Sequence, residues 1–245
     1  MNVNENYKCI NGFILKMIAI LTMLTDHIGA VLFPGQMLFR YIGRIAFPIF
    51  IFLLVEGFLH TRNIRKYELR LFLFALISEI PFDLAFDGVL VQPDSQNVFV
   101  TLFLGLLMLD FMQQAQARIS MTAKKAQKIV IEVLILLVFM IIANLLETDY
   151  SAGGILLIWV FYRLRGKNLQ ITVLMWVITG FFFGAIEWFC LIAMVPIALY
   201  NGERGFSNGR IYSGQATGAA AVFVKWAFYL FYPVHLLILH FISVL

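Results

Sequence analysis

The chain has 245 residues, of which 62% are hydrophobic and only 13% are charged, and its mean hydropathy is +0.89. Soluble domains carry about 25% charged residues, so the composition excludes an ordinary soluble domain and predicts a polytopic membrane protein. The net charge of +4 is modest, and the sequence has no Gly-rich phosphate loop and no zinc-ligand spacing. We therefore expect neither nucleic-acid binding nor a metal site.

Apolar segments of helical length recur along the chain, and they predict an all-α bundle that forms a single domain over residues 1–245. A membrane-spanning helix needs about 20 mostly apolar residues, and fewer where the bundle is irregular. Within residues 170–200 we expect a tight turn at Gly184, Ala185 and Glu187 between two half-length helices. The expected number of spans is about nine, and eight or ten are the alternatives. The segments predict about nine transmembrane helices, at residues 13–33, 39–59, 69–86, 98–112, 128–147, 151–163, 170–185, 187–200 and 222–243.

The charges between these segments predict an orientation. Arg and Lys follow the second, fourth, sixth and eighth segments, whereas Asp and Glu follow the third, fifth and seventh. Basic loops mark the cytoplasmic side of a membrane, so we expect a cytoplasmic N-terminus and an outside C-terminus. Arg40 and Arg44 break this alternation because they begin the second span on its outer side, and this suggests a functional role for them.

Ionisable side chains inside the predicted spans are the main candidates for function. Each costs at least about 2.5–3.5 kcal/mol on insertion scales and usually faces the interior of a bundle. A helical rise of about 1.5 Å per residue places them at similar depths, from the middle of the bilayer outward, on the first, second, third and ninth spans. The residues in this layer are Asp26, His27, Arg44, Glu79, Asp83 and His235.

Within this layer, His27 is the side chain best suited to passing a proton near neutral pH. Its neighbour Asp26 diverges from it by about 100° on a helix, so we expect Glu79 or Asp83 to orient the His27 ring. Glu79 and Asp83 are four residues apart and share a helix face, and two such carboxylates cannot both stay charged cheaply. In a purely structural alternative, Arg44 bridges to one of these two acids and holds the spans together.

Several long stretches carry a further signal, namely "LKMIAILTMLTDHIG", "RYIGRIAFPIFIFLLVEGFLHTRN", "KYELRLFLFALISEIPFDL", "NVFVTLFLGL", "LYNGERG" and "FYPVHLLIL". In this order they resemble the TraX family of integral membrane proteins, over residues 13–112 and 196–240. The family is named for the factor that acetylates the N-terminus of conjugative F-pilin. The resemblance implies a bacterial inner-membrane enzyme, an acetyl-CoA-dependent N- or O-acetyltransferase that takes its donor from the cytoplasm.

The resemblance also implies roles for particular residues. His27 would act as the general base or carry the acetyl group briefly, beside Asp26, with His235 as a second candidate base or a packing residue. Arg44 or Tyr232 would stabilise the oxyanion, and Glu79 and Asp83 would orient the histidine or bind a cationic amine. A cytoplasmic rim would hold the phosphates of acetyl-CoA, although membrane orientation alone also explains its basic residues. The residues of this rim are Arg62, Arg65, Lys66, Asn201, Gly202, Arg204 and Arg210.

A peptide N-terminus, an amino sugar or a cell-surface polymer such as a glycan would fit as the acceptor. Membrane lipids are the other expected partners. Two further functions stay open. In a proton-coupled transporter, Glu79 and Asp83 would load protons, whereas a non-enzymatic assembly factor for a pilus or surface structure would use the polar layer as a binding cleft.

Overall fold

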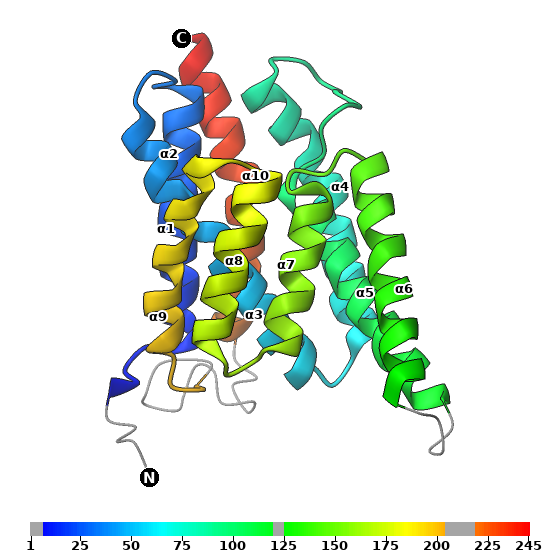
Figure 1. Ribbon diagram of the computed structural model, residues 1–245. Helices are drawn as coiled ribbons and strands as arrows, with labels where there is room; N and C mark the ends of the chain where they lie inside the picture. Colours follow the sequence, from blue (N-terminus) through cyan, green and yellow to red (C-terminus); the bar gives the residue numbers. More distant parts are fainter. Residues whose placement is uncertain (1–6, 120–124, 204–218) are drawn as a thin grey trace.

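The computed structural model describes residues 7–119, 125–203 and 219–245, with the side chains of the last range from residue 226 onward. This part of the chain is all-helical, as predicted, and its segments run alternately up and down (Figure 1). The elements are α1 (Gly12–Val31), α2 (Met37–Gly43), α3 (Ala46–His60), α4 (Ile64–Phe86), α5 (Val98–Arg118), α6 (Lys125–Leu145), α7 (Ser151–Arg163), α8 (Asn168–Phe182), the 3-10 helix η2 (Ala185–Ala193), α9 (Met194–Ala198) and α10 (Ala219–Val244).

The predicted segments coincide with helices, but the predicted number of spans is wrong. Among the described residues, five helical stretches are long and apolar enough to cross a membrane. Helix α4 has the length but carries charged side chains near both ends, and α7, α8 and the η2–α9 stretch are shorter apolar helices. The five stretches are Gly12–Val31, Met37–His60, Val98–Arg118, Lys125–Leu145 and Trp226–Val244.

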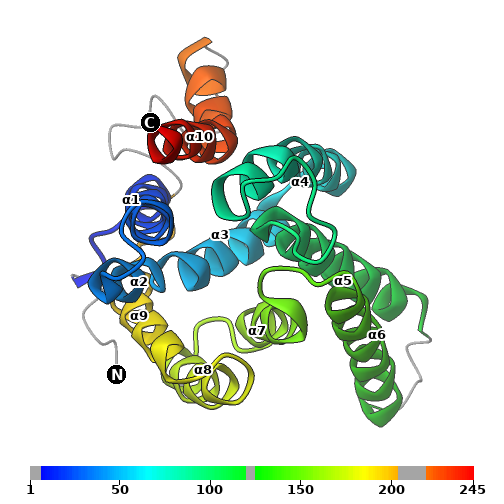
Figure 2. The same ribbon diagram turned by 90° about the horizontal axis from the view of Figure 1, so that it is seen from above.

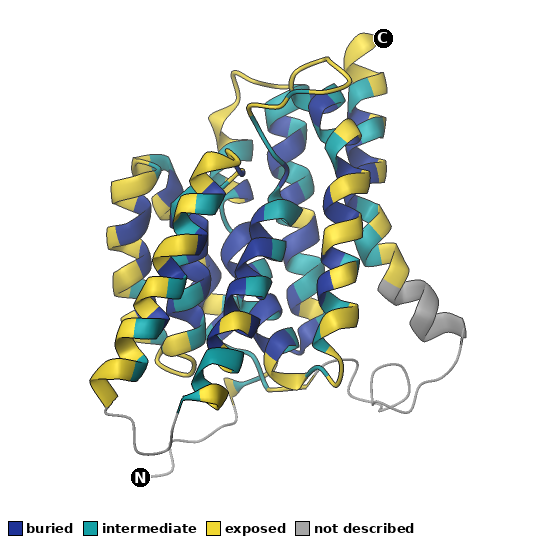
Figure 3. Cartoon of the chain, turned by 90° about the vertical axis from the view of Figure 1, so that its right-hand side faces the viewer, coloured by how far each residue is buried: buried dark blue, intermediate teal, exposed yellow. Residues whose placement is uncertain are grey.

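Helix α3 runs through the centre of the bundle and packs against α1, α5, α7 and η2 (Figure 2). Its side chains Ile49 and Ile51 are fully buried, as are Leu106 of α5 and Ile158 of α7. Exposed residues lie on the outside of the bundle (Figure 3), and many of them are large and apolar. Because water would disfavour such a surface, this distribution is typical of a multi-pass membrane protein.

Helix α10 packs against α4 and α1, and this contact creates a second, smaller apolar cluster. The cluster contains Met23 of α1, Ala46 of α3, Ala85 of α4, and Tyr232 and Leu236 of α10. It therefore brings the first, third, fourth and last α-helices of the chain together. We call the end of the bundle at which α1 begins the N-terminal end, and the end that holds the C-terminus the C-terminal end (Figure 1).

Candidate functional site

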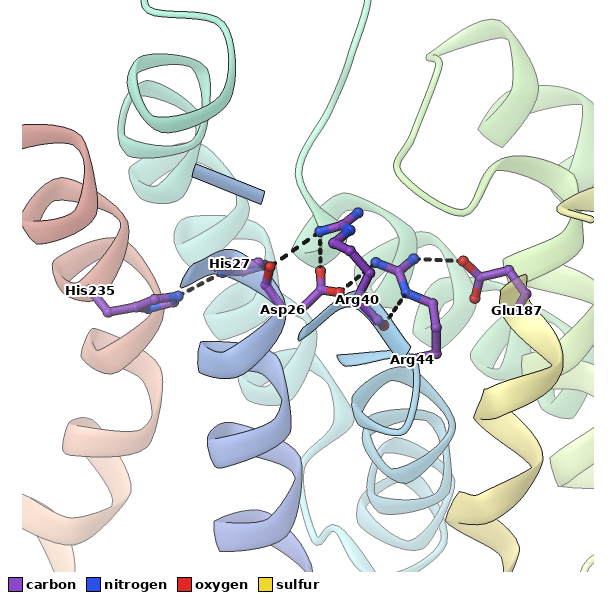
Figure 4. A network of polar contacts seen from close by, with 6 residues as sticks. All are labelled: Asp26, His27, Arg40, Arg44, Glu187 and His235. Atoms are coloured by element: carbon purple, nitrogen blue, oxygen red, sulfur yellow. Dashed lines mark hydrogen bonds and ion pairs between the residues drawn. The ribbon is translucent and has the colours of Figure 1, made fainter. Parts of the chain in front are cut away.

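An ion-pair cluster lies toward the C-terminal end of the bundle, where α1, α2 and η2 meet (Figure 4). Asp26 of α1 accepts from Arg40 Nη1 at 2.6 Å and from Arg44 Nη2 at 2.7 Å. Arg44 also donates through Nη1 to Glu187 of η2 at 2.6 Å. Asp26 and Glu187 are buried, so these pairs are poorly screened by solvent. Arg44 thus ties three elements together.

The approach of α2 to α1 depends on a glycine. Arg40 and Arg44 are separated by one helical turn, and Gly43 lies between them at the end of α2. A Cβ atom built on Gly43 would lie 2.1 Å from Asp26 Oδ1 and 2.2 Å from Asp26 Cβ. A larger residue would therefore push Asp26 out of the position in which it meets both guanidinium groups.

A pair of histidines lies next to this cluster, on the other face of α1. His27 Nδ1 is 2.7 Å from His235 Nε2, and the two rings are nearly parallel, with centroids 5.0 Å apart. His235 Nδ1 is in turn 2.7 Å from the Phe231 carbonyl oxygen. Figure 4 shows His235 on the far side of His27 from the two arginines.

The two carboxylates of α4 do not take the positions expected of them. Asp83 accepts a hydrogen bond from the Gln92 backbone N–H at 2.8 Å, and Glu79 accepts one from the Asn97 side chain. The predictions that one of these acids orients His27, and alternatively that Arg44 bridges to one of them, are therefore wrong. Both acids instead fasten the segment between α4 and α5. Glu79 Oε1 and Asp83 Oδ1 are buried, without a hydrogen-bond partner among the described residues.

A cavity of about 240 Å³ lies among these groups at the C-terminal end. Its walls come from α1 to α5, from α10 and from the loops between α4 and α5 and between α6 and α7. Asp26 and His27 reach the cavity, whereas His235 is not among the lining residues. The cavity is lined on its polar side by Asp26, His27, Arg40, Arg44, Asp87 and Asp149, and on its aromatic side by Phe47, Phe50, Phe82, Phe86, Tyr150 and Tyr232.

Two loop residues at this cavity were missed by sequence reasoning. Tyr150 stacks on Phe47, with ring centroids 3.5 Å apart. Asp149 keeps contact with solvent, but the surrounding protein removes part of its hydration and raises the pKa of its carboxyl to about 6. The positive charge of Arg44 opposes this rise, and the negative charge of Asp26 adds to it. Asp149 therefore changes charge in the cavity wall at mildly acidic pH.

The described residues of the predicted phosphate rim lie at the opposite end of the bundle from the cavity. Arg65 there forms ion pairs with Glu68 at 2.9 Å and Asp110 at 3.3 Å, so its charge is already engaged. Arg62 and Lys66 are exposed, and neither has an ion-pair partner within the described ranges. Of the proposed rim on this side, these two cations are the ones left to meet a ligand.

The other half of the predicted rim is a turn after α9. Asn201 Oδ1 accepts from the Glu203 backbone N–H at 2.9 Å, and Gly202 has a φ of +85°, a left-handed conformation that favours glycine. The Glu203 carbonyl accepts from the Gly12 N–H at 2.7 Å and ties this turn to the start of α1. Arg204 and Arg210 lie outside the described residues.

Sequence reasoning also missed a set of buried carboxylates toward the N-terminal end, each held by an arginine. Glu56 pairs with Arg165 of the loop after α7. Glu132 pairs with Arg163 at 3.1 Å and accepts from Trp159 Nε1 at 2.7 Å. The signal was a single acid inside each otherwise apolar helix, which predicts an inward-facing charge with a partner. These pairs link α3 and α6 to the α7 region.

Together these features define a multi-pass helical membrane protein with a charged and aromatic cavity near one end of its bundle. The sequence profile of the TraX protein family matches residues 11–243, and the chain belongs to this family. No solved structure matches it significantly.

Two relatives illustrate the similarity. The chain is 29% identical over 262 residues to the probable fimbrial assembly protein FimC, serogroup H1, of Dichelobacter nodosus, and the alignment covers 94% of each chain. It is also 32% identical over 92 residues to the uncharacterized protein RP591 of Rickettsia prowazekii (strain Madrid E), which covers 38% of this chain and 34% of the relative. The first alignment extends the likeness over nearly the whole bundle.

Proposed function

We propose that the chain is a membrane acetyltransferase that moves an acetyl group from acetyl-CoA to an amine or hydroxyl acceptor bound in the cavity. The observation that carries this proposal is the placement of the His27 imidazole in a cavity wall that also presents Arg40 and Arg44. A base beside cationic groups is the combination that acyl transfer requires, because the attacking group loses a proton while negative charge develops on the carbonyl oxygen.

In this proposal, His27 removes a proton from the acceptor as its nitrogen or oxygen attacks the thioester carbonyl carbon. The resulting tetrahedral oxyanion faces Arg40, whose side chain is 29% exposed and is bound only through Nη1 among the described residues. Arg44 is less suited to this task because Asp26 and Glu187 already engage it. The C–S bond then breaks, the acetyl group stays on the acceptor, and the CoA thiolate takes the proton from His27.

The donor would enter from the N-terminal end of the bundle. We place this end in the cytoplasm of a bacterial cell, and the bundle in the inner membrane, because basic loops mark the cytoplasmic side. Arg62 and Lys66 would meet the phosphates of acetyl-CoA. From Gly12 to His27, α1 rises by about 22 Å, so the pantetheine arm would have to extend into the bundle to bring the thioester to the base.

The acceptor would then be a peptide N-terminus or a cell-surface glycan that reaches the cavity from the C-terminal end. One observation favours a second function, since the relative from Dichelobacter nodosus that aligns over almost the whole chain is named for fimbrial assembly. In that reading the protein is a non-enzymatic assembly factor, and the cavity holds a segment of the assembled subunit without chemistry.

Transfer of radiolabelled acetyl groups from acetyl-CoA into membrane extracts tests the proposal. The wild-type protein should label an acceptor, whereas His27→Ala should reduce the rate by on the order of 10²-fold or more, as expected for loss of a general base. His240→Ala is the matched control for His27→Ala, because it removes a histidine that does not line the cavity. Normal labelling by a folded His27→Ala protein would refute the assignment of the base.

Thermal denaturation in detergent separates the two functions. Acetyl-CoA at saturating concentration should raise the melting temperature of the enzyme, and Arg62→Ala combined with Lys66→Ala should weaken this effect. A stable protein that gains no stability from acetyl-CoA and labels no acceptor would favour the assembly factor.

A further inference from the structure

We propose that His235 is a positioning residue that fixes the tautomer of His27, so that His27 Nε2 is the nitrogen that takes up the proton. This inference rests on the proposed acetyl transfer, but it concerns a chain of hydrogen bonds that can be observed without any reaction. It follows from three groups that lie in a row, namely the Phe231 carbonyl, the His235 ring and the His27 ring.

The direction of each hydrogen bond follows from the carbonyl. A carbonyl oxygen can only accept, so His235 Nδ1, 2.7 Å from the Phe231 oxygen, carries a proton. A neutral imidazole has one N–H, which leaves His235 Nε2 as an acceptor. His27 Nδ1, 2.7 Å from that atom, is then the donor. His27 Nε2 is left without a proton and has no partner among the described residues.

Packing holds the two rings in this arrangement. His27 is 9% exposed and His235 is 5% exposed. The His27 ring also makes T-shaped contacts with Phe86 and Tyr232, with centroids 5.3 and 5.8 Å away, and Phe231 stacks on His235 with centroids 4.7 Å apart. Neither ring can turn over without displacing these aromatic neighbours, so the donor and acceptor assignment is fixed by the fold.

In the part of the chain that the structure describes, His235 is the side chain that hydrogen-bonds to the His27 ring. Asp26 is the neighbouring acid, but its two oxygens are held by Arg40 and Arg44. Glu79 and Asp83 are engaged with the segment between α4 and α5. His235 is thus the group that decides which His27 nitrogen is basic.

The pair also suits a site inside a membrane. When His27 Nε2 accepts a proton from the acceptor, the new imidazolium donates through Nδ1–H to His235, and this bond becomes charge-assisted and stronger. A carboxylate would do the same but would require a permanent buried negative charge, which is costly in hydrocarbon. The neutral His235 ring accepts from His27 Nδ1–H in both charge states of His27, and it adds no permanent charge to the interior of the bundle.

Long-range ¹H–¹⁵N correlation spectra of the protein in detergent, labelled with ¹⁵N-histidine, test the tautomer directly. The chain has four histidines, so His60→Gln and His240→Gln together leave the pair of interest alone in the spectrum. Near neutral pH, His27 should carry its proton on Nδ1, and His235→Phe should shift it to Nε2, the form preferred in water. A proton on His27 Nε2 in the parent protein, or unchanged His27 signals in His235→Phe, would overturn the inference.

Acetyl transfer gives the second readout. His235→Phe should lower kcat by on the order of 10²-fold and leave KM for acetyl-CoA unchanged. His235→Gln should retain most of the activity because its amide oxygen can accept from His27 Nδ1–H. Equal activity of the two variants would overturn the positioning role.

The two readouts keep the proposals separable. If His27 has the predicted tautomer but the protein transfers no acetyl group, the proposed function is refuted and the hydrogen bonds from Phe231 through His235 to His27 stand. If the protein is active but His27 carries its proton on Nε2, only the positioning role of His235 is refuted.

Discussion

Gly43→Ala is the substitution that tests the ion-pair cluster most sharply. The added Cβ would lie 2.1 Å from Asp26 Oδ1, 2.2 Å from its Cβ and 2.4 Å from its Cγ, whereas ordinary contacts begin at 3.4 Å. Three atoms of one short side chain are involved, so a change of rotamer alone cannot relieve the clash. Asp26 must move by more than an ångström, and its ion pairs with Arg40 and Arg44 at 2.6 and 2.7 Å cannot survive that displacement.

The expected cost follows from two effects. Overpacking alone costs about 1–3 kcal/mol, and leaving a buried charge without its partner costs about 3–5 kcal/mol, which is the situation of Asp26 once it is pushed away from both arginines. The second effect dominates, and we expect a loss of about 3–5 kcal/mol in the free energy of unfolding. For a chain of this size that corresponds to a fall in melting temperature of roughly 6–20 °C.

Thermal denaturation in detergent measures this change. Gly35→Ala is the matched control, because Gly35 lies in the neighbouring loop and an added Cβ there meets nothing within 4 Å. Its stability should stay within about 0.5 kcal/mol of the wild type. In an Asp26→Gly background, Gly43→Ala should cost little, since all three atoms that the new Cβ would displace are gone. A Gly43→Ala protein that melts like Gly35→Ala would show that α1 and α2 do not approach as described.

Three further predictions concern other charges. Arg44→Lys should lower the free energy of unfolding by about 2 kcal/mol, because one ammonium group cannot replace a guanidinium group that joins two carboxylates. A melting temperature in detergent equal to that of the wild type would contradict this. The pKa of Asp149 is raised to about 6 in the folded protein, against about 3.9 in the unfolded chain. At a pH above both pKa values, the charged carboxylate therefore disfavours folding. The stability of the wild type should therefore rise relative to that of Asp149→Asn as the pH falls from about 7 to about 4. Solvent around Asp149 keeps this effect small. Parallel curves of melting temperature against pH for the two proteins would refute the raised pKa. Glu132→Gln should cost under about 1 kcal/mol, since exposed Arg163 is rehydrated, whereas Glu132→Ala should cost about 1–3 kcal/mol more by leaving Trp159 Nε1 without an acceptor; equal losses would refute the role of that hydrogen bond.

The all-helical fold could be read from the sequence because hydrophobic stretches of helical length are strong signals. Most helix ends were predicted to within three residues, but α4 begins five residues earlier and α5 ends six residues later than predicted, and the second predicted span is divided into α2 and α3. The turn was predicted near Gly184, which has a φ of +86° between α8 and η2. The number of spans could not be read in the same way. Short segments such as α7 and α8 are apolar enough to resemble spans, and only their length excludes them from the five stretches.

The layer of ionisable residues was predicted from depth along each helix, and the structure does bring Asp26, His27, Arg44 and His235 together. The partners within that layer were not predictable. Depth says nothing about which way a side chain points around its helix, so Glu79 and Asp83 were assigned to His27 although they face the segment between α4 and α5. Glu187 was read as part of a loop because it follows a glycine turn. A 3-10 helix there brings it to Arg44.

Asp26 and His27 are adjacent in the chain, yet Asp26 forms the ion pairs with the arginines and His27 is hydrogen-bonded to His235. A ligand that draws Arg40 and Arg44 toward itself would also displace Asp26, because both guanidinium groups are bonded to its carboxylate. A shift of the α1 backbone at Asp26 would move His27 with it. Ligand binding at the two arginines and the position of the proposed base would therefore be coupled directly through α1.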